Sequence, residues 1–314
     1  MLWLLIPFGA ALFYSLRMFI ENYLTDRYFK REKVSPDVLV IPGCISLILV
    51  LICFTIYFGP QIFTTADWQS ILLLAAGGVV NILAFVPYYK SYKTEEPTGV
   101  IIMTQMAPIL SLGMAAVFLG EVINFSQGVS FFMIFGAILL LIFEKSTRKK
   151  RKMELKTAAL MFIACLCWVL ADILYAPAAR ELGLEASYVW FLLGELVMVF
   201  ILSLIMKSWR QNLAKFLHRK KSQKLLIITV GEIIYAVAEV LFHAGLIILP
   251  VAIMTVLEHI FGLILVFILG IVFTIFYPKF AHEKLAKRTI VHHLIALILV
   301  ALGIILLNSS QQLL

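Results

Sequence analysis

Long apolar blocks constrain this chain most. Blocks of about 18 to 25 mostly apolar residues recur between short polar segments, which is the length that crosses about 30 Å of hydrocarbon as a helix. Hydrophobic residues make up 62% of the 314 residues and charged residues 14%, whereas a soluble globular domain has roughly 25% charged residues. A water-soluble fold could not cover this much apolar surface. The sequence therefore predicts an all-α, polytopic membrane protein.

The spacing of the polar segments predicts ten transmembrane helices. The first apolar block lacks a basic segment before it and a small-residue cleavage site after it, so we expect a retained helix and no signal peptide. The predicted helices lie near residues 2–24, 38–58, 68–89, 97–119, 125–143, 157–177, 187–206, 225–246, 250–276 and 290–308.

Basic residues predict the orientation. The loops after the first, third, fifth, seventh and ninth predicted helices hold 24 of the 26 Lys and Arg residues, and Arg180 is the single one in the other loops. Because basic loops stay cytoplasmic, we expect these five loops inside and both termini outside, in the plasma membrane. The net charge of +8 then follows from a basic rim that faces lipid headgroups, and no nucleic-acid partner is expected. The longest basic loop, 207–224, is too short to fold alone.

An internal repeat is visible when the chain is shifted by 151 residues. Ile102-Met103-Thr104 then falls on Ile253-Met254-Thr255, Gly43 on Gly194, and Asn81 on Glu232. Five helices in each half require the second half to insert upside down, which is the inverted repeat of many secondary transporters. We therefore predict a first repeat at 1–144, a basic linker at 145–156 and a second repeat at 157–314.

Ionisable residues inside the predicted helices are the best candidates for a functional site. A carboxylate in the bilayer centre costs about 2.5 to 3.5 kcal/mol on insertion scales, so it needs a partner or a function. In helix 225–246, Glu232, Tyr235, Glu239 and His243 follow at i, i+3, i+7 and i+11 and share one face. We expect these residues to line a cavity between the helices that binds the substrate or protons. The further residues that we expect around it are Glu258, His259, Asn81, Tyr88, Gln105, Trp168, Asp172 and Tyr175.

Several of these residues also allow a structural interpretation. Glu239 and His243 could simply satisfy each other, and Arg17 with Glu21 forms an i, i+4 pair. Glu195 could extend outward or pair with a residue of helix 225–246. The four cysteines lack metal or redox spacing and are expected in the apolar core; they are Cys44, Cys53, Cys165 and Cys167.

Two helices near the end of the first half carry a recognisable pattern: Ala107-Pro108-Ile109-Leu110, Phe118-Leu119-Gly120-Glu121, Gln127-Gly128 and Gly136-Ala137-Ile138-Leu139. This pattern resembles the EamA-like branch of the drug/metabolite transporter superfamily. The resemblance implies a central cavity lined by the first, third, fourth, sixth, eighth and ninth helices. Gly120 and Glu121 are expected to end a helix, Pro108 to kink it, and Gly136, like Gly77, Gly78, Gly113 and Gly128, to allow close packing.

The sequence departs from that family in two respects. His259 stands where the second half should have the proline, and a basic connection over 277–293 replaces the short Leu-Gly-Glu turn. Family members also keep both termini in the cytoplasm, whereas the charges here predict the reverse.

We therefore expect a secondary transporter, an exporter driven by protons, for a small organic metabolite. It would need no cofactor, and its oligomeric state is open, with a homo-oligomer as one option. One alternative is a carrier of divalent metal ions that uses Glu239, His243, Glu258 and His259 as ligands. The other is a membrane enzyme or scaffold, which the chain favours least because it has no nucleophile elbow, nucleotide-binding loop or soluble domain.

Overall fold

The structure is a computed structural model. It describes residues 2–24, 28–29, 39–64, 66–91, 103–121, 155–218 and 221–276, together with 124–125, 128–130, 132–133, 136, 295, 298–299, 302–303 and 306. Throughout these residues the regular structure is helical, which confirms the all-α prediction. The predicted helices 125–143 and 290–308, and the linker 145–156, fall largely outside the described residues.

Nine α-helices are described, and their order follows the predicted spans closely. Six of them, α3, α4, α8, α9, α11 and α12, are long and apolar enough to cross a membrane, and α6 is a shorter apolar helix. The two-repeat arrangement itself stays a prediction. The bounds are η1 Leu2–Leu4, α1 Leu5–Leu24, α3 Val40–Phe58, η4 Pro60–Phe63, α4 Trp68–Ser91, α6 Met106–Leu119, α8 Leu155–Leu182, α9 Leu184–Ile205, α10 Lys207–His218, α11 Lys221–Ile248 and α12 Val251–Phe276.

Helix α10 corrects the prediction of a loop after α9. Its apolar residues Trp209 and Leu213 are one turn apart, so they share the face that packs on the core. The guanidinium of Arg210 donates hydrogen bonds to the carbonyl oxygens of Ser203 and Leu204 at the end of α9. These bonds satisfy carbonyl groups that a helix end leaves without partners, and so they fix the turn between α9 and α10.

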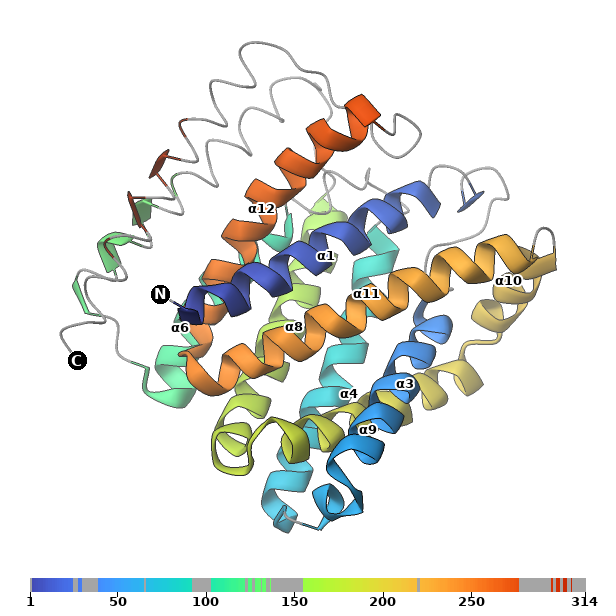
Figure 1. The fold of residues 1–314 in the computed structure, drawn as a ribbon, viewed down its shortest axis with the longest axis horizontal. Helices are drawn as coiled ribbons and strands as arrows, with labels where there is room; N and C mark the ends of the chain where they lie inside the picture. The colour runs from blue at the N-terminus through green and yellow to red at the C-terminus, as the bar shows by residue number, and fades with distance from the viewer. Residues whose placement is uncertain are drawn as a thin grey trace.

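The helices pack in a reciprocal pattern. Helix α4 contacts α8 and α9, and α11, which the predicted repeat matches to α4, contacts α1 and α3. In the same way α6 packs on α8, while α12 packs on α1. Figure 1 shows α1, α11 and α12 side by side. Helices α3 and α9, and α6 and α12, meet across the two halves. This is the pairing that two related halves would produce.

Two glycines allow α4 and α9 to touch backbone to backbone. A Cβ on Gly78 would lie 2.1 Å from the carbonyl oxygen of Phe191, and a Cβ on Gly194 would lie 2.1 Å from that of Ala75. Gly77 is also tight, with its nearest neighbours at 3.2 Å. The other glycines predicted to pack closely, Gly113, Gly128 and Gly136, have no neighbour within 4 Å among the described residues.

The outer faces of the helices are apolar. On α3, Ile48, Ile52 and Ile56 are exposed together with Cys53. Cys53 therefore does not belong to the core, which corrects that prediction, whereas Cys165 is buried. An exposed apolar surface of this kind is expected where helices face lipid rather than water.

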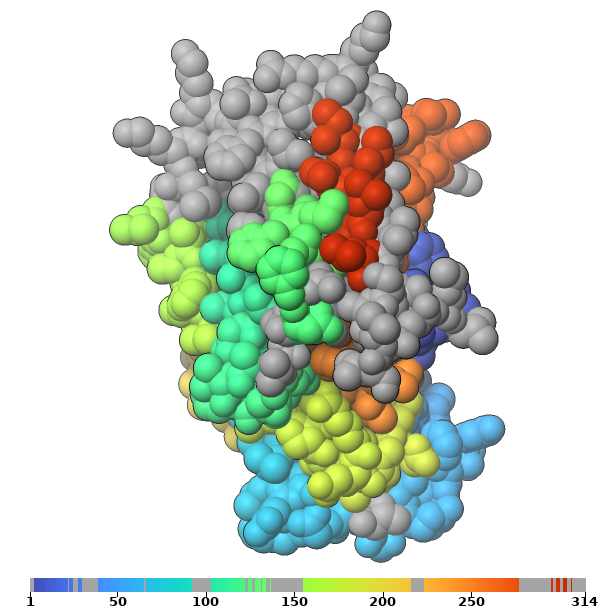
Figure 2. Space-filling view, turned by 90° about the vertical axis from the view of Figure 1, so that its left-hand side faces the viewer, coloured from blue at the N-terminus to red at the C-terminus, as the bar shows by residue number. Residues whose placement is uncertain are grey.

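The connections of α3 to α4, of α8 to α9 and of α11 to α12 gather at one end of the molecule. In Figure 2 the connection of α3 to α4, in blue to cyan, and the junction of α8 and α9, in yellow, lie toward the lower end. At this end Asp67 precedes α4 and accepts hydrogen bonds from the backbone N–H groups of Gln69 and Ser70, at 3.0 and 3.3 Å. Hydrogen bonding by Ser70, and by the backbone at Gln69, holds the pKa of this exposed carboxyl below its usual range.

The glycine contact between α4 and α9 generates a stability prediction. Replacing Gly78 with alanine should lower the thermal unfolding temperature of the purified protein, because the new methyl group overlaps backbone atoms; overpacking costs about 1 to 3 kcal/mol. Gly113→Ala is the matched control, since it adds the same group where nothing lies within 4 Å. Equal unfolding temperatures for the two variants would contradict the close contact.

Candidate functional site

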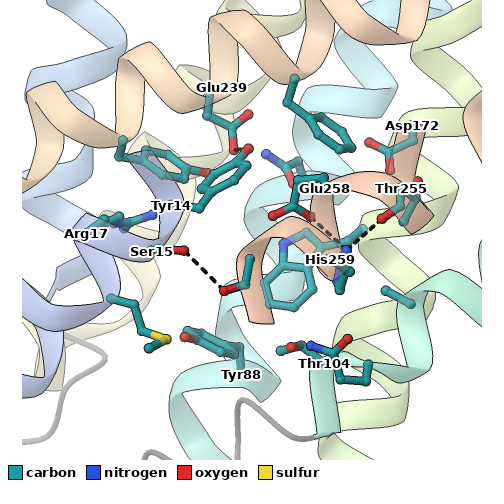
Figure 3. A pocket seen from close by; sticks show the side chains of 18 of the residues that line it. Tyr14, Ser15, Arg17, Tyr88, Thr104, Asp172, Glu239, Thr255, Glu258 and His259 are labelled. Carbon is teal, nitrogen blue, oxygen red and sulfur yellow. Dashed lines mark hydrogen bonds and ion pairs between the residues drawn. The ribbon is translucent and has the colours of Figure 1, made fainter. Parts of the chain in front are cut away.

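A cavity of about 240 Å³ lies between α1, α4, α6, α8, α11 and α12. These are the six helices for which the family resemblance implies this role. Figure 3 shows polar side chains from these helices around the cavity. Ten of the twelve residues predicted to line a cavity do so: Asn81, Tyr88, Gln105, Trp168, Asp172, Tyr235, Glu239, His243, Glu258 and His259.

The remaining two, Glu232 and Tyr175, do not line this cavity. Glu232 is buried on the far side of Tyr235, where the hydroxyl of Ser46 donates a hydrogen bond to it at 3.1 Å. The hydroxyl of Tyr175 forms a hydrogen bond with Ser187 at 3.0 Å. Both residues have partners in the protein and are structural in this arrangement.

Arg17 of α1 lines the cavity and contacts three side chains. Its guanidinium lies 3.2 Å from the Glu21 carboxylate, which confirms the predicted i, i+4 pair. It also lies 3.7 Å from the Glu232 carboxylate of α11, and 3.7 Å above the ring of Tyr235. A cation over an aromatic face is attracted by the ring as well as by the carboxylates. One arginine therefore connects α1 to α11 through charge and stacking.

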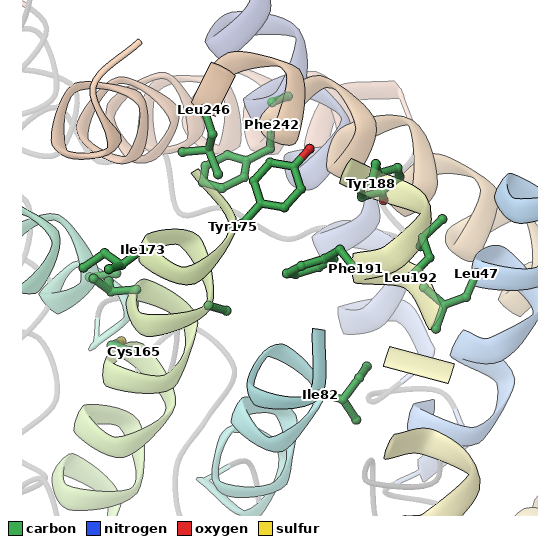
Figure 4. Close-up of a cluster of buried hydrophobic side chains, with 14 of the residues drawn as sticks. Leu47, Ile82, Cys165, Ile173, Tyr175, Tyr188, Phe191, Leu192, Phe242 and Leu246 are labelled. Atoms are coloured by element: carbon green, nitrogen blue, oxygen red, sulfur yellow. The ribbon is translucent and has the colours of Figure 1, made fainter. Parts of the chain in front are cut away.

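Glu239 and His243 form a second group, on α11. The hydroxyl of Tyr14 donates a hydrogen bond to Glu239 at 2.8 Å, and Nδ1 of His243 lies 3.4 Å from the same carboxylate. Aromatic rings surround the imidazole; the centroids of Tyr175 and Phe191 are 4.5 and 4.6 Å away. Figure 4 shows these rings gathered with Phe242. His243 is 2% exposed, and its Nε2 has no hydrogen-bond partner in the described part of the chain.

A third group lies where α6, α8 and α12 meet. His259 Nδ1 is 2.7 Å from the Glu258 carboxylate and 3.0 Å from the carbonyl oxygen of Thr255. Asp172 of α8 faces the same space (Figure 3), and no hydrogen bond or ion pair joins it to the described residues. Glu258 is therefore paired with a residue of its own helix, whereas Asp172 is open to the cavity.

Pro108 accounts for an interruption just before α6, one of the helices of this third group. Because proline has no N–H, it cannot donate to the carbonyl of Thr104 one turn earlier. A turn at Gln105 separates residues 103–104 from α6. The backbone of Thr104 instead interacts with His259 of α12. The break thus brings Thr104 and Gln105 to the cavity wall.

Glu195 of α9 is a buried carboxyl beyond the cavity. It is 2% exposed, and Nδ2 of Asn81 on α4 donates a hydrogen bond to it at 2.6 Å. The sequence led us to expect an outward side chain or a partner on α11, and neither prediction is right. The partner lies on α4 because Gly78 and Gly194 bring α4 and α9 into direct contact.

Glu121 and Arg180 form a contact, here called the Glu121–Arg180 clasp, at the end where the helix connections gather. The guanidinium of Arg180 lies 3.1 Å from Glu121 and donates hydrogen bonds to the carbonyl oxygens of Leu246 and Leu249 at the end of α11. Glu121 accepts hydrogen bonds from the backbone N–H of Val251 and of Ala252, which begin α12, at 2.9 and 3.3 Å. The clasp therefore holds α6 and α8 to the turn between α11 and α12.

Gly120 makes the clasp possible. It ends α6 in the left-handed conformation, with φ 64°, so the predicted helix end is confirmed. The turn directs Glu121 toward the N-terminus of α12, where a carboxylate is favoured by the helix dipole and the free N–H groups. Sequence reasoning gave Glu121 only a packing role, because its partner Arg180 lies in the other half of the chain.

Tightly packed residues separate the cavity from the clasp. Ala176, Ala179, Leu246, Val251 and Met254 are all 0% exposed. In α4 all the residues that line the cavity, and in α1 all but Tyr14, lie in the second half of the helix, away from the clasp. Along α8, α11 and α12, buried side chains therefore lie between the cavity and the clasp.

Several lining residues were not predicted, and Tyr14 is the most important of them. Tyr14, Arg17 and Glu21 lie at i, i+3 and i+7 of α1, a spacing that places them on one face. The same periodicity that identified α11 would have found this face. Phe85 and Thr255 also line the cavity, but neither stands out in an apolar helix.

Comparison with known proteins gives the family of the first half. Residues 1–143 match the EamA-like transporter family, which belongs to the drug/metabolite transporter superfamily, so the resemblance is confirmed over these residues. No curated protein matches the chain. Among 22 matching chains of solved structures, one described only as a crystal structure of a protein is 15% identical. It aligns with a TM-score of 0.69 over 98% of this chain and 96% of its own, and at this identity the likeness concerns the fold alone.

The Arg17 network generates a stability prediction. Arg17→Gln should lower the thermal unfolding temperature, because removing one partner of a buried ion pair costs about 3 kcal/mol or more. The double variant Arg17→Gln, Glu232→Gln should recover part of the loss, since the carboxylate without a partner is gone. Lys215→Gln is the control, because Lys215 is an exposed residue of α10. If the single and double variants unfold at the same temperature, Glu232 does not depend on Arg17.

Proposed function

Because residues 1–143 match the EamA-like transporter family, we propose that this multi-pass membrane protein is a secondary active transporter of a small organic metabolite. The observation that carries the proposal is the central cavity. Ionisable side chains from α1, α8, α11 and α12 line it, although the protein could have filled this space with apolar side chains at no cost in desolvation. Intramembrane ionisable groups that face a cavity are typical of a solute pathway.

Alternating access is the proposed mechanism. The packed end with the Glu121–Arg180 clasp would form the closed gate of this state, and the reciprocal contacts of the two halves would allow the opposite state. Because the basic loops lie at the other ends of the helices, we place the clasp on the outer side of the membrane and the termini outside. Opening the clasp would let a solute leave the cell, which is export.

Proton coupling follows from the carboxyl groups at the cavity. Asp172, Glu239 and Glu258 can each take up or release a proton when the gate changes side. Asp172 is the most suitable of the three, since no hydrogen bond or ion pair to the described residues holds its charge. Protons that enter through the open gate would then drive the solute outward.

The alternatives receive less support. A zinc site has three or four protein ligands at one point, and in the described part of the chain no three His, Cys, Asp or Glu side chains come together in this way. The four candidate ligands form two separate pairs, Glu239 with His243 and Glu258 with His259. No observation favours an enzyme or a scaffold.

Flux through proteoliposomes tests the proposal. Purified protein should move at least one solute from a panel of amino acids, amines and nucleotide precursors when a proton gradient is applied. Glu239→Gln should lower this flux about tenfold or more, because the hydrogen-bonded carboxyl at the cavity is lost. Glu185→Gln, an exposed acid at the start of α9, is the control and should leave flux unchanged. Absence of flux for the whole panel would contradict a transporter.

The clasp gives a second test. With the native cysteines replaced by serine, Thr255→Cys places a thiol in the cavity, behind the clasp. Adding Glu121→Gln should speed its reaction with a membrane-impermeant maleimide, added from the clasp side, by about tenfold, because hydrogen bonds to a charged group are lost. Glu185→Gln should have no effect. An unchanged rate in the Glu121 variant would mean that the clasp is not a gate.

A further inference from the structure

The charges around the cavity do not balance. Of the described residues that line it, four carry carboxyl groups, Glu21, Asp172, Glu239 and Glu258, and Arg17 is the one Lys or Arg. With all four carboxyl groups ionised, the excess is three negative charges when both histidines are neutral and one when both are protonated. A low-dielectric cavity amplifies this imbalance. Cations or protons are therefore needed to occupy it.

Arg17 cannot supply a binding site for an anion. Its guanidinium is already shared between Glu21 at 3.2 Å and Glu232 at 3.7 Å, and it lies on the Tyr235 ring. An anion that approached it would have to displace two carboxylates and would meet the other acids of the cavity. This arrangement disfavours an anionic substrate on electrostatic grounds.

Two side chains that line the cavity have an acceptor group without a donor among the described residues. Oε1 of Gln105 is buried without a hydrogen-bond partner, on a side chain that is 6% exposed. Asp172 likewise has no hydrogen bond or ion pair to the described residues. Buried acceptors normally have a partner, because an unsatisfied one costs about 1 to 3 kcal/mol. A ligand that brings N–H donors and a positive charge would satisfy both.

Aromatic rings supply the rest of the wall. Trp168 lies 5.2 Å from Tyr88 and 5.7 Å from Phe85, measured between ring centroids, and all three rings line the cavity with Tyr14, Tyr235 and Phe242. Rings beside carboxylates are the usual surroundings of an organic ammonium group. The volume of about 240 Å³ lies below the range of roughly 300 to 1,000 Å³ for drug-sized ligands, so the ligand is small.

We infer that the substrate of this cavity is a small organic cation: an ammonium group that binds at Asp172 and Gln105, attached to an apolar or aromatic body that packs against Trp168 and Tyr88. This inference rests on the proposed transporter function and names its substrate class. A metal ion would not need the aromatic wall, and a neutral solute would leave the charge imbalance in place.

Binding of three probes of similar size tests the inference on the purified full-length protein. Benzylammonium is positively charged at neutral pH and carries three N–H donors, 3-phenylpropionate is an anion, and benzyl alcohol is neutral. The cation should raise the thermal unfolding temperature, and the other two should not. Benzylammonium should also enter proteoliposomes that contain the protein faster than protein-free liposomes.

Variants locate the binding site. Asp172→Asn should raise the dissociation constant of benzylammonium about tenfold or more, as expected for the loss of a charged hydrogen-bond partner. Asp67→Asn is the matched control, because Asp67 is exposed in front of α4 and an asparagine can keep its hydrogen bonds. Trp168→Leu, which leaves every charge in place, should weaken binding severalfold and is informative even if Asp172→Asn does not fold.

The outcomes separate the two proposals. If 3-phenylpropionate or benzyl alcohol binds and is transported while the cation is not, the substrate class is wrong and the transporter stands. If benzylammonium binds equally well to wild type, Asp172→Asn and Trp168→Leu, the proposed site is wrong. If no probe binds, the inference fails; the proteoliposome panel then decides separately whether the chain transports anything.

Discussion

An ionised side chain inside hydrocarbon needs a partner or a polar space, because it costs about 2.5 to 3.5 kcal/mol at the bilayer centre. This constraint accounts for the position of the buried acids. Glu232 meets Arg17 and Ser46, and Glu195 meets Asn81. Other acids, among them Asp172, Glu239 and Glu258, face one shared cavity. The cavity is therefore a requirement of the sequence once the helices have formed.

Two kinds of contact hold the helices around this cavity, and they differ in how easily they separate. Helices α4 and α9 meet backbone to backbone at Gly78 and Gly194, a contact with no side chain that can rearrange. The turn between α11 and α12 is held by the ion pair and hydrogen bonds of Glu121 and Arg180, which can exchange with water. Since α11 and α12 carry Glu239 and Glu258, a movement that opens the clasp also shifts the acids of the cavity.

Sequence reasoning predicted the structural features that depend on a single helix. The apolar blocks gave the spans, helical periodicity gave the shared face of α11, and i, i+4 spacing gave the pair of Arg17 and Glu21. It missed what depends on packing between helices. Glu232 and Glu239 share a face, yet they lie about 10 Å apart along the helix axis, so their carboxyl groups contact different residues of the neighbouring helices. The partners of Glu195 and Glu121 depend on contacts between helices that are distant in the sequence. A single sequence gives no information about which of these helices meet.

Asp172 should therefore be reached by water in the cavity, whereas other positions of the same helix should face lipid. Reaction of single cysteines with a hydrophilic thiol reagent tests it most directly, in membranes and with the native cysteines replaced by serine. A cysteine at position 172 should react, and one at position 163, where Ile163 is 48% exposed on the outer face of α8, should not. Reaction at 163 but not at 172, or at neither position, would contradict the account.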